Sequence, residues 1–202
     1  MIKDVIICKC STSNTKGKSY LVIDINGKII RGFDMFESKK CIEIRMLAEK
    51  FRSAIDTVVD NRELTIHPFD KFPNDCCDMT SELLSHYLTE HNIQNQLIIG
   101  THRNDFQWNH VWVQTMDDIV VDITGDQFDG KPNMPDDVCR VYVGKEGDVQ
   151  KMFCENRQFE TPTNFKESIY DSFGIPNRRK SDLLKAYNII ERYLCAEELK
   201  GS

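Results

Sequence analysis

Two different spacings of apolar residues alternate along the 202-residue chain. Residues 3–8 and 19–25 are rich in β-branched side chains and predict strands. Asn26-Gly27 favours a tight hairpin turn, so residues 28–36 predict the returning strand. The first 36 residues are therefore expected to form a small antiparallel sheet.

The spacing then changes to that of a helix. Between residues 41 and 61, apolar side chains recur every three or four positions, at Ile44, Leu47, Phe51 and Ile55. Ser38 is the expected N-cap of this helix, because its hydroxyl can accept a bond from a first-turn amide. Residues 61–74 contain Pro68 and Pro73 and predict a loop.

The same spacing of apolar residues, every three or four positions, predicts two further helices. The first begins at the adjacent pair Cys76-Cys77, with Asn74 or Asp75 as the expected cap, and its apolar face comprises Met79, Leu83, Leu84, Tyr87 and Leu88. The last is expected to begin at Ser181 as its N-cap, with apolar positions at Leu183, Leu184, Tyr187, Ile190 and Leu194.

Between these helices, residues 95–102, 109–114, 119–124 and 140–144 predict strands. Their connections are short, so neighbouring strands are expected to run antiparallel, and the fold class is α+β rather than a doubly wound parallel sheet. We expect an N-terminal β element over residues 1–36, a core over 37–160 and a C-terminal helical extension over 161–202, together forming one compact unit.

Composition and charge limit the classes of function that the chain can have. Hydrophobic residues make up 40% of the chain and charged residues 29%, as in ordinary soluble proteins, and the formal net charge of -6 argues against nucleic acid as the main partner. No segment approaches the about 18 apolar residues of a membrane span, and no signal peptide is evident. We therefore expect a cytoplasmic protein without a membrane partner, whose eight cysteines are thiols.

A histidine and an aspartate are predicted to share one face of a hairpin. If the turn in residues 115–118 is centred on Met116, paired residue numbers sum to 232, which places His110 opposite Asp122. Val111 and Val113 then point to the opposite, core face. Directly opposed β-carbons lie about 5 Å apart, so the carboxylate can accept a hydrogen bond from the imidazole.

A cysteine at the start of a helix would complete a nucleophilic triad. The helix N-terminus carries about half a positive charge, which stabilises a thiolate. Its first-turn N–H groups can also stabilise an oxyanion. Cys77 is the expected nucleophile and Cys76 the fallback, because Cys77 stands three residues before the small, polar pair Thr80-Ser81.

Each residue also has a purely structural interpretation. Cys77 fits a buried small residue, His110 a hydrogen-bonded sheet residue and Asp122 a turn cap. Zinc bound by Cys76, Cys77, His110 and Asp122 is a weaker alternative, because adjacent cysteines do not suit one tetrahedral ion. A disulfide between the two adjacent cysteines would be strained. Because zinc binding is also the weaker alternative and thiol catalysis needs no other group, we expect no metal and no cofactor.

In these three motifs the chain resembles the papain-like superfamily, and within it the transglutaminase-like branch. The matching residues are Cys77 at a helix start, His110 in NHVWV and Asp122 in VVDIT, separated by 33 and 12 residues. The segment VDITGDQF is similar to a form seen in bacterial members, and the resemblance spans roughly residues 70–130. Cys76 and Asp78 depart from the family, which has Gly or small residues around its nucleophile.

The resemblance implies a cysteine protease, amidase, deamidase or transglutaminase-like enzyme that acts on an amide or thioester carbonyl of a protein or peptide. A papain-like fold without catalysis, acting as a protein-binding module, is the alternative. Trp112, Gln127 and Asn109 are candidate substrate or oxyanion contacts, although a packing role fits Trp112 equally well and a structural role fits Gln127 better. The remaining histidines, His67, His86, His91 and His102, are expected at the surface.

Overall fold

The computed structural model describes residues 6–9, 19–23, 29–34, 38–136, 138–160 and 178–198. The chain divides into two compact units, Met1–Ile42 and Glu43–Ser202. The first unit contains a three-stranded antiparallel sheet in the order β1 (Ile6–Lys9), β2 (Ser19–Ile23) and β3 (Ile29–Asp34). This agrees with the predicted small sheet, while the predicted turn at Asn26-Gly27 lies outside the described residues.

The long helix α1 (Lys39–Asp60) begins where the sequence predicts it. The Cys41 N–H donates to Ser38 Oγ at 3.1 Å, which confirms Ser38 as the N-cap. Ile44, Phe51 and Ile55 are fully buried, as their helical spacing indicates. The loop after α1 contains the 3₁₀ turn η1 (Phe69–Lys71) and leads the chain to the two adjacent cysteines.

The second unit is built on a five-stranded antiparallel sheet in the order β7-β6-β5-β4-β8. Its strands are β4 (Asn95–His102), β5 (Asn109–Thr115), β6 (Val120–Asp122), β7 (Tyr142–Gly144) and β8 (Phe153–Glu160). The fold is therefore α+β, with the expected antiparallel pairing. The sequence did not predict β8, whose largely polar and charged residues show no clear alternation of apolar positions.

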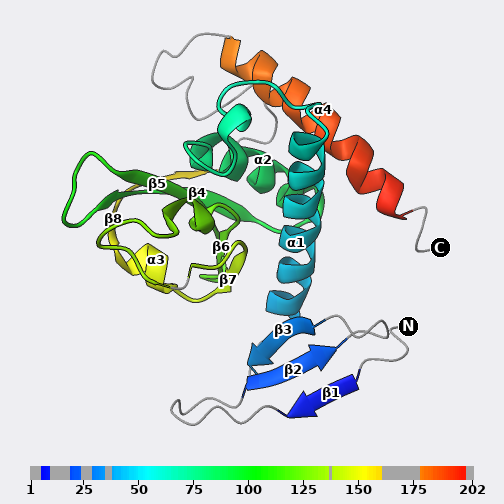
Figure 1. Ribbon diagram of the computed structural model, residues 1–202, viewed down its shortest axis with the longest axis vertical. Coiled ribbons are helices and arrows are strands. Elements are labelled where there is room, and N and C mark those ends of the chain that lie inside the picture. Colours follow the sequence, from blue (N-terminus) through cyan, green and yellow to red (C-terminus); the bar gives the residue numbers. More distant parts are fainter. Residues whose placement is uncertain are drawn as a thin grey trace. The chain divides into compact units, whose positions relative to one another are not determined.

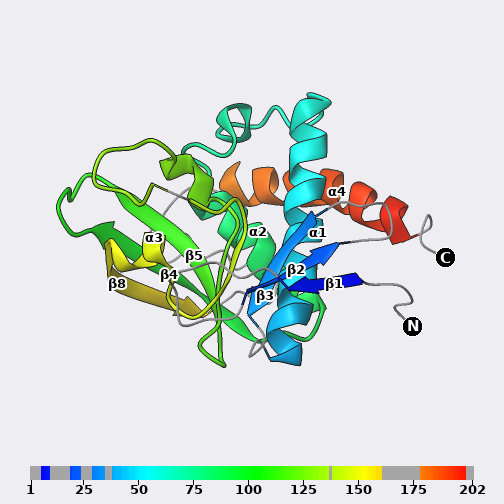
Figure 2. The same ribbon diagram turned by 60° about the horizontal axis from the view of Figure 1, so that its bottom comes forward.

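Helix α2 (Cys77–Glu90) lies between α1 and the strands β4 and β5 in both views of the molecule (Figures 1 and 2). Because it is covered on several sides, it buries polar as well as apolar residues, including Thr80, Ser81 and Ser85. The ring of Tyr87 stacks on Phe51 of α1 with centroids 4.9 Å apart. This central helix presents its first turn, with Cys77, to the end of the sheet that carries His110.

Helix α4 (Arg178–Glu198) covers α2 and begins three residues before the predicted N-cap Ser181, which is therefore wrong as a cap. Leu183, Tyr187 and Ile190 are buried as predicted, whereas Leu184 is 52% exposed. The Tyr187 hydroxyl donates to the Glu90 carboxylate at the end of α2. Among the described residues no helix combines the length and the apolar character needed to cross a bilayer.

The β5–β6 hairpin corrects the predicted register. Val113 pairs with Val121 and Gln114 with Val120, so paired numbers sum to 234 and not to 232. The loop is centred one residue later than predicted, on Asp117: the Thr115 N–H donates to the Ile119 carbonyl at 2.9 Å, which leaves a three-residue loop that ends with Asp118 at φ 57°. Since the shift is two residues, every side chain keeps its predicted face.

On the His110 face of the sheet, Gly100 makes room for a large indole. Gly100 pairs with His110, and a Cβ on it would lie 2.9 Å from Trp112 Cη2 and 2.8 Å from Phe153 Cβ. Trp112 and Phe153 are both 1% exposed and form a buried cluster whose other members are Ile98, Val120, Phe128 and Val149. The absence of a side chain at Gly100 thus allows the aromatic packing that surrounds His110.

We predict that Gly100→Ala lowers the free energy of unfolding by about 1–3 kcal/mol, because the added methyl group overpacks the cluster. Urea unfolding followed by tryptophan fluorescence measures this change. Gly130→Asn is the matched control, since Gly130 has φ 67° and a Cβ added to it would meet no atom within 4 Å, and asparagine tolerates that backbone region. Equal stability of Gly100→Ala and the wild type would contradict the packing role.

Candidate active site

A buried imidazole–carboxylate pair lies where β5 and β6 separate. His110 Nε2 is 2.7 Å from Asp122 Oδ2, and the two side chains are 0% and 1% exposed. With the corrected register, Asp122 lies beside Trp112 and reaches His110 along the diagonal of the sheet, a distance that side chains of this length can span. The predicted pairing of these two side chains is therefore present, although they are not directly opposite each other.

Asp122 is saturated with hydrogen-bond donors. Its Oδ1 accepts the Thr124 backbone N–H at 2.9 Å, and its Oδ2 accepts Gln150 Nε2 at 2.6 Å in addition to His110. Burial alone would raise the pKa of Asp122, but the charge and hydrogen bond of His110, followed by the Thr124 bonds, outweigh it and hold the pKa below its usual value. The carboxylate is thus kept ionised inside the protein.

The pKa of the His110 imidazole is shifted in the opposite direction, upward. Burial opposes the charged ring, yet the charge and hydrogen bond of Asp122, and then a hydrogen bond and charge interaction with Cys77, raise the pKa of His110 to about 10. Cys77 therefore lies within interaction range of the same ring that Asp122 contacts. Because Nε2 is bonded to Asp122, Nδ1 is the ring nitrogen left for the thiol.

The two adjacent cysteines have different surroundings. Cys76 is fully buried, and its Sγ lies 3.1 Å from the Pro68 carbonyl and 3.0 Å from the Asn74 carbonyl. Burial, then the nearby charges of Asp78 and Cys77, raise the pKa of Cys76 to about 12. Cys77 is partly exposed and is the first residue of α2. Cys76 is therefore held as a protonated thiol, and Cys77 is the sulfur placed for reaction.

The start of α2 is not capped as predicted. Its N-cap residue is Cys76, which makes no side-chain capping bond, so the predicted caps Asn74 and Asp75 are wrong. Asp75 has φ 58°, and Asp78 Oδ1 accepts the Met79 N–H at 2.7 Å. The Asp78 carboxylate thus bonds a first-turn amide in place of a capping side chain, and Cys77 is the first helical residue.

A hydroxyl group joins the nucleophile's helix to the histidine's strand. Ser81, one turn after Cys77, donates from Oγ to the Val111 carbonyl at 2.9 Å. Val111 follows His110 directly, and its carbonyl is available because the β5–β6 pairs begin at Val113. The bond ties α2 to β5 within a few residues of Cys77 and His110.

Gln127 lies against the other ring nitrogen. Its Nε2 donates to the Thr124 carbonyl at 2.9 Å and lies 3.3 Å from His110 Nδ1. Because a carbonyl only accepts, the amide NH₂ faces Nδ1, and this contact suits a ring with a lone pair on Nδ1. Gln127 therefore favours the neutral imidazole, which can take a proton, and opposes the effect of Asp122.

The other two predicted contact residues differ in exposure. Trp112 is 1% exposed and its ring centroid is 5.8 Å from that of His110, so it packs beside the imidazole. Asn109 is exposed and its Oδ1 accepts from the Thr101 hydroxyl at 2.7 Å. Phe128 meets His110 edge-on at 4.9 Å, and aromatic side chains thus shield the ring from water.

Arg52 of α1 holds the segment that follows Asp122. Its Nη1 donates to the Ile123 carbonyl at 2.5 Å, and its two Nη atoms contact the Asp126 carboxylate at 2.9 and 2.7 Å. Asp126 belongs to the 3₁₀ turn η2 (Gly125–Phe128), which also carries Gln127 and Phe128. Arg52 thereby fixes the turn that supplies two of the contacts around the His110–Asp122 pair, those of Gln127 and Phe128.

Several of these residues were not predicted from the sequence. The pattern Asp-Ile-Thr in residues 122–124 does signal an Asx-type turn, so a local pattern does point to the Thr124 bond. Gln150 and Arg52 lie 28 and 70 residues from Asp122, and no local pattern links them to it. His102 was expected at the surface, but it is 3% exposed and packs between Trp108 and Phe153, each 5.5 Å away.

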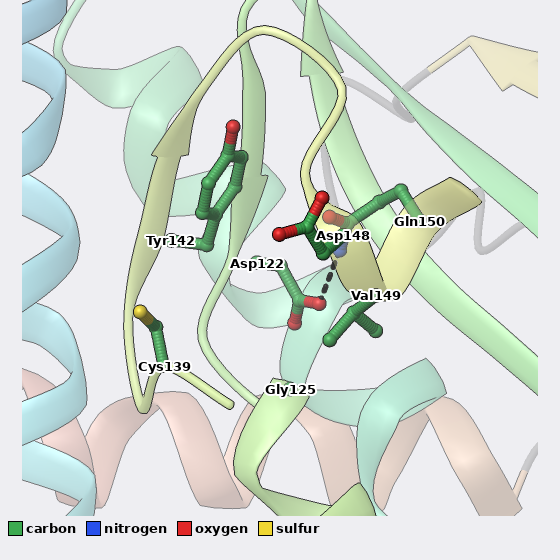
Figure 3. Close-up of a pocket in the computed structure, with 7 residues that line it drawn as sticks. All are labelled: Asp122, Gly125, Cys139, Tyr142, Asp148, Val149 and Gln150. Atoms are coloured by element: carbon green, nitrogen blue, oxygen red, sulfur yellow. Dashed lines mark hydrogen bonds between the residues drawn. The ribbon is translucent and has the colours of Figure 1, made fainter. Parts of the chain in front are cut away.

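A small cavity of about 80 Å³ adjoins the far side of Asp122 (Figure 3). It is lined by Asp122, Gly125, Cys139, Tyr142, Asp148, Val149 and Gln150. Within the part of the chain that the structure describes, no group of three or more His, Cys, Asp or Glu side chains is placed to hold a metal ion. The described centre is thus a thiol, an imidazole and a carboxylate with amide donors around them.

No family model matches the chain, and no curated protein or solved structure matches it either. The chemistry of the site therefore has to be inferred from its own geometry.

The two pKa shifts predict a pH window for stability. Asp122 has a lowered pKa in the folded protein, so its contribution is present above about pH 4 and is lost as the pH falls through the folded value. His110 has a raised pKa, so its contribution is complete below about pH 6.5. It is lost as the pH rises toward about 10, because the folded state then holds a proton that the unfolded state has released.

We therefore expect the difference in free energy of unfolding between the wild type and Asp122→Asn to be largest between about pH 4 and 6.5 and to shrink toward pH 10. Urea titrations at pH 5, 7 and 9 measure it. Asp118→Asn, at an exposed turn position with φ 57°, is the control and should show no such trend. A difference that is constant with pH would show that the pair is not coupled as described.

Proposed function

We propose that the protein is a cysteine-dependent acyl hydrolase or acyltransferase that acts on amide or thioester carbonyls of proteins or peptides. The observation that supports this best is the shared imidazole: His110 is bonded to the buried Asp122 and interacts with Cys77 at the start of α2. Residues from three separate elements would thus supply the nucleophile, the base and the group that orients the base, as nucleophilic catalysis requires.

In the proposed reaction His110, whose pKa is raised to about 10, already holds the thiol proton of Cys77 as an ion pair, and the sulfur attacks the carbonyl carbon. The tetrahedral intermediate then collapses, its C–N or C–S bond breaks, and His110 protonates the leaving amine or thiol. Water, or a second amine, attacks the thioester with His110 again taking the proton, and this releases the acyl group and restores the Cys77 thiol. Asp122 holds the ring with Nε2 protonated and stabilises its positive charge.

The first turn of α2 has a second role in this proposal. Backbone N–H groups at the start of a helix point out of its end, where Cys77 is the first residue; that of Met79 is bonded to Asp78. A negative charge that develops on the carbonyl oxygen of a substrate bound to Cys77 would lie close to these donors. The same helix end therefore favours both the thiolate and the tetrahedral intermediate.

The fold that we propose is a papain-like core of the transglutaminase-like branch. The support is the order Cys77, His110, Asp122, with the thiol at a helix start and the other two side chains on neighbouring antiparallel strands. A cytoplasmic setting suits this chemistry, since thiols stay reduced there. Hydrolysis, deamidation and transamidation use the same three residues and differ in which molecule attacks the acyl-enzyme.

One observation favours a second function. The His110 side chain is 0% exposed, and the cavity beside the centre is lined by Asp122 and not by Cys77 or His110. A site closed in this way also suits a protein-binding module that retains the fold without turnover. Thiol reactivity separates the two functions, because only the enzyme requires an activated sulfur.

We predict that iodoacetamide at pH 6 modifies Cys77 roughly 10- to 100-fold faster than an ordinary exposed thiol, because a thiolate is the reactive form. Peptide mapping by mass spectrometry measures the rate for each cysteine. Cys154, exposed on β8, provides the reference within the same molecule. Cys77→Ala should remove the fast reaction, whereas Cys76→Ala should retain it; a Cys77 rate equal to that of Cys154 would favour the binding module.

We also predict that an activated thioester forms a covalent acyl adduct on Cys77, which intact-mass measurement detects and peptide mapping locates. His110→Ala should slow adduct formation by at least about 100-fold, the usual scale for a general base. Release that accelerates when a primary amine is added would identify transfer, and release independent of amine would identify hydrolysis. An adduct that forms equally fast in Cys77→Ala would refute the assignment of the nucleophile.

A further inference from the structure

We infer that Gln150 is a positioning residue of the same centre, acting through Asp122; this inference rests on the proposed function. Gln150 belongs to the short helix α3 (Asp148–Lys151), is 3% exposed and lies 28 residues from Asp122 in the chain. Its Nε2 donates to Asp122 Oδ2 at 2.6 Å, the same oxygen that contacts His110 at 2.7 Å (Figure 3).

The chemistry of the contact fixes its direction. A carboxylate oxygen only accepts, so the NH₂ end of the Gln150 amide must face Asp122. Buried hydrogen bonds to a charged acceptor are about twice as strong as neutral ones. With Thr124 bonded to Oδ1 on one side and Gln150 to Oδ2 on the other, the carboxylate plane cannot rotate without breaking a bond. Oδ2 is therefore held toward His110 Nε2.

The local backbone is built to admit the Gln150 amide. Gly147 precedes α3, and a Cβ on it would lie 2.6 Å from Gln150 Oε1 and 2.8 Å from Tyr142 Cζ. Tyr142 in turn pairs with Asp122 in the β6–β7 register. The lack of a side chain at Gly147 thus lets the amide lie over the backbone beside the strand that carries Asp122.

This arrangement matters when His110 becomes charged. The imidazolium is stabilised only while Asp122 keeps its orientation, and a small rotation of the carboxylate would lengthen the 2.7 Å contact. The hydrogen bond of the Gln150 side chain is to Asp122, so we expect its effect on the centre to pass through that carboxylate. It should therefore disappear when Asp122 is removed.

The test is a double-mutant cycle of Gln150→Leu with Asp122→Ala, read by the midpoint of urea unfolding and by the alkylation rate of Cys77. Leucine fits the position, because Gln150 borders a cavity of about 80 Å³. We expect Gln150→Leu to lower the midpoint and to slow alkylation by about 10-fold in the wild type, and to leave the midpoint unchanged in Asp122→Ala. Gln114→Leu, on the same sheet but outside the centre, is the control for alkylation and should leave that rate unchanged; it loses only the Gln114 bond to Asp118 in the β5–β6 turn.

A proton NMR measurement separates this inference from the proposed function. The proton in the buried His110–Asp122 bond should give a downfield resonance that is absent in Asp122→Ala, and Gln150→Leu should shift it whether or not Cys77 is reactive. Gln150→Met repeats the test with an unbranched side chain if the leucine variant fails to fold. An equal loss of stability in both backgrounds, with an unmoved resonance, would overturn the positioning role.

Discussion

The site depends on burying an ion pair without leaving any of its hydrogen-bonding groups unmatched. A charged imidazole and carboxylate that are 0% and 1% exposed are costly to remove from water. The cost is offset because Asp122 receives bonds from His110 on β5, from the nearby Thr124 and from Gln150 on α3. The strand, the residues before η2 and α3 thus all contribute hydrogen bonds to one buried carboxylate.

The surroundings act on the imidazole in two directions. Asp122 and Cys77 favour the charged ring and raise its pKa, whereas the Gln127 amide beside Nδ1 favours the neutral one. A group that must accept a proton and then give it back benefits from this balance. The adjacent cysteines also differ in their surroundings, because burial raises the pKa of Cys76 to about 12, whereas Cys77 is partly exposed at the start of α2.

Much of this could be predicted from the sequence, because short-range patterns determine it. Apolar spacing located α1, α2 and strands β4 to β6, and alternation placed His110 and Asp122 on one face. The register was wrong because it depends on the turn, in which Asp118 adopts a left-handed backbone. The bonds from Gln150 and Arg52 were not predictable, since they join residues that only the folded chain brings together.

The bond from Ser81 to the Val111 carbonyl has a consequence for how the molecule can vary. It joins the first turns of α2 and the start of β5 into one rigid body, which carries both the Cys77 sulfur and the His110 imidazole. The loop of residues 103–108 borders this body; Trp108 packs against the buried His102, whereas Phe106 is 81% exposed and can vary without disturbing the Ser81 bond. In the proposed enzyme, substrate selectivity would therefore change at such exposed positions while the sulfur and the imidazole stay in place.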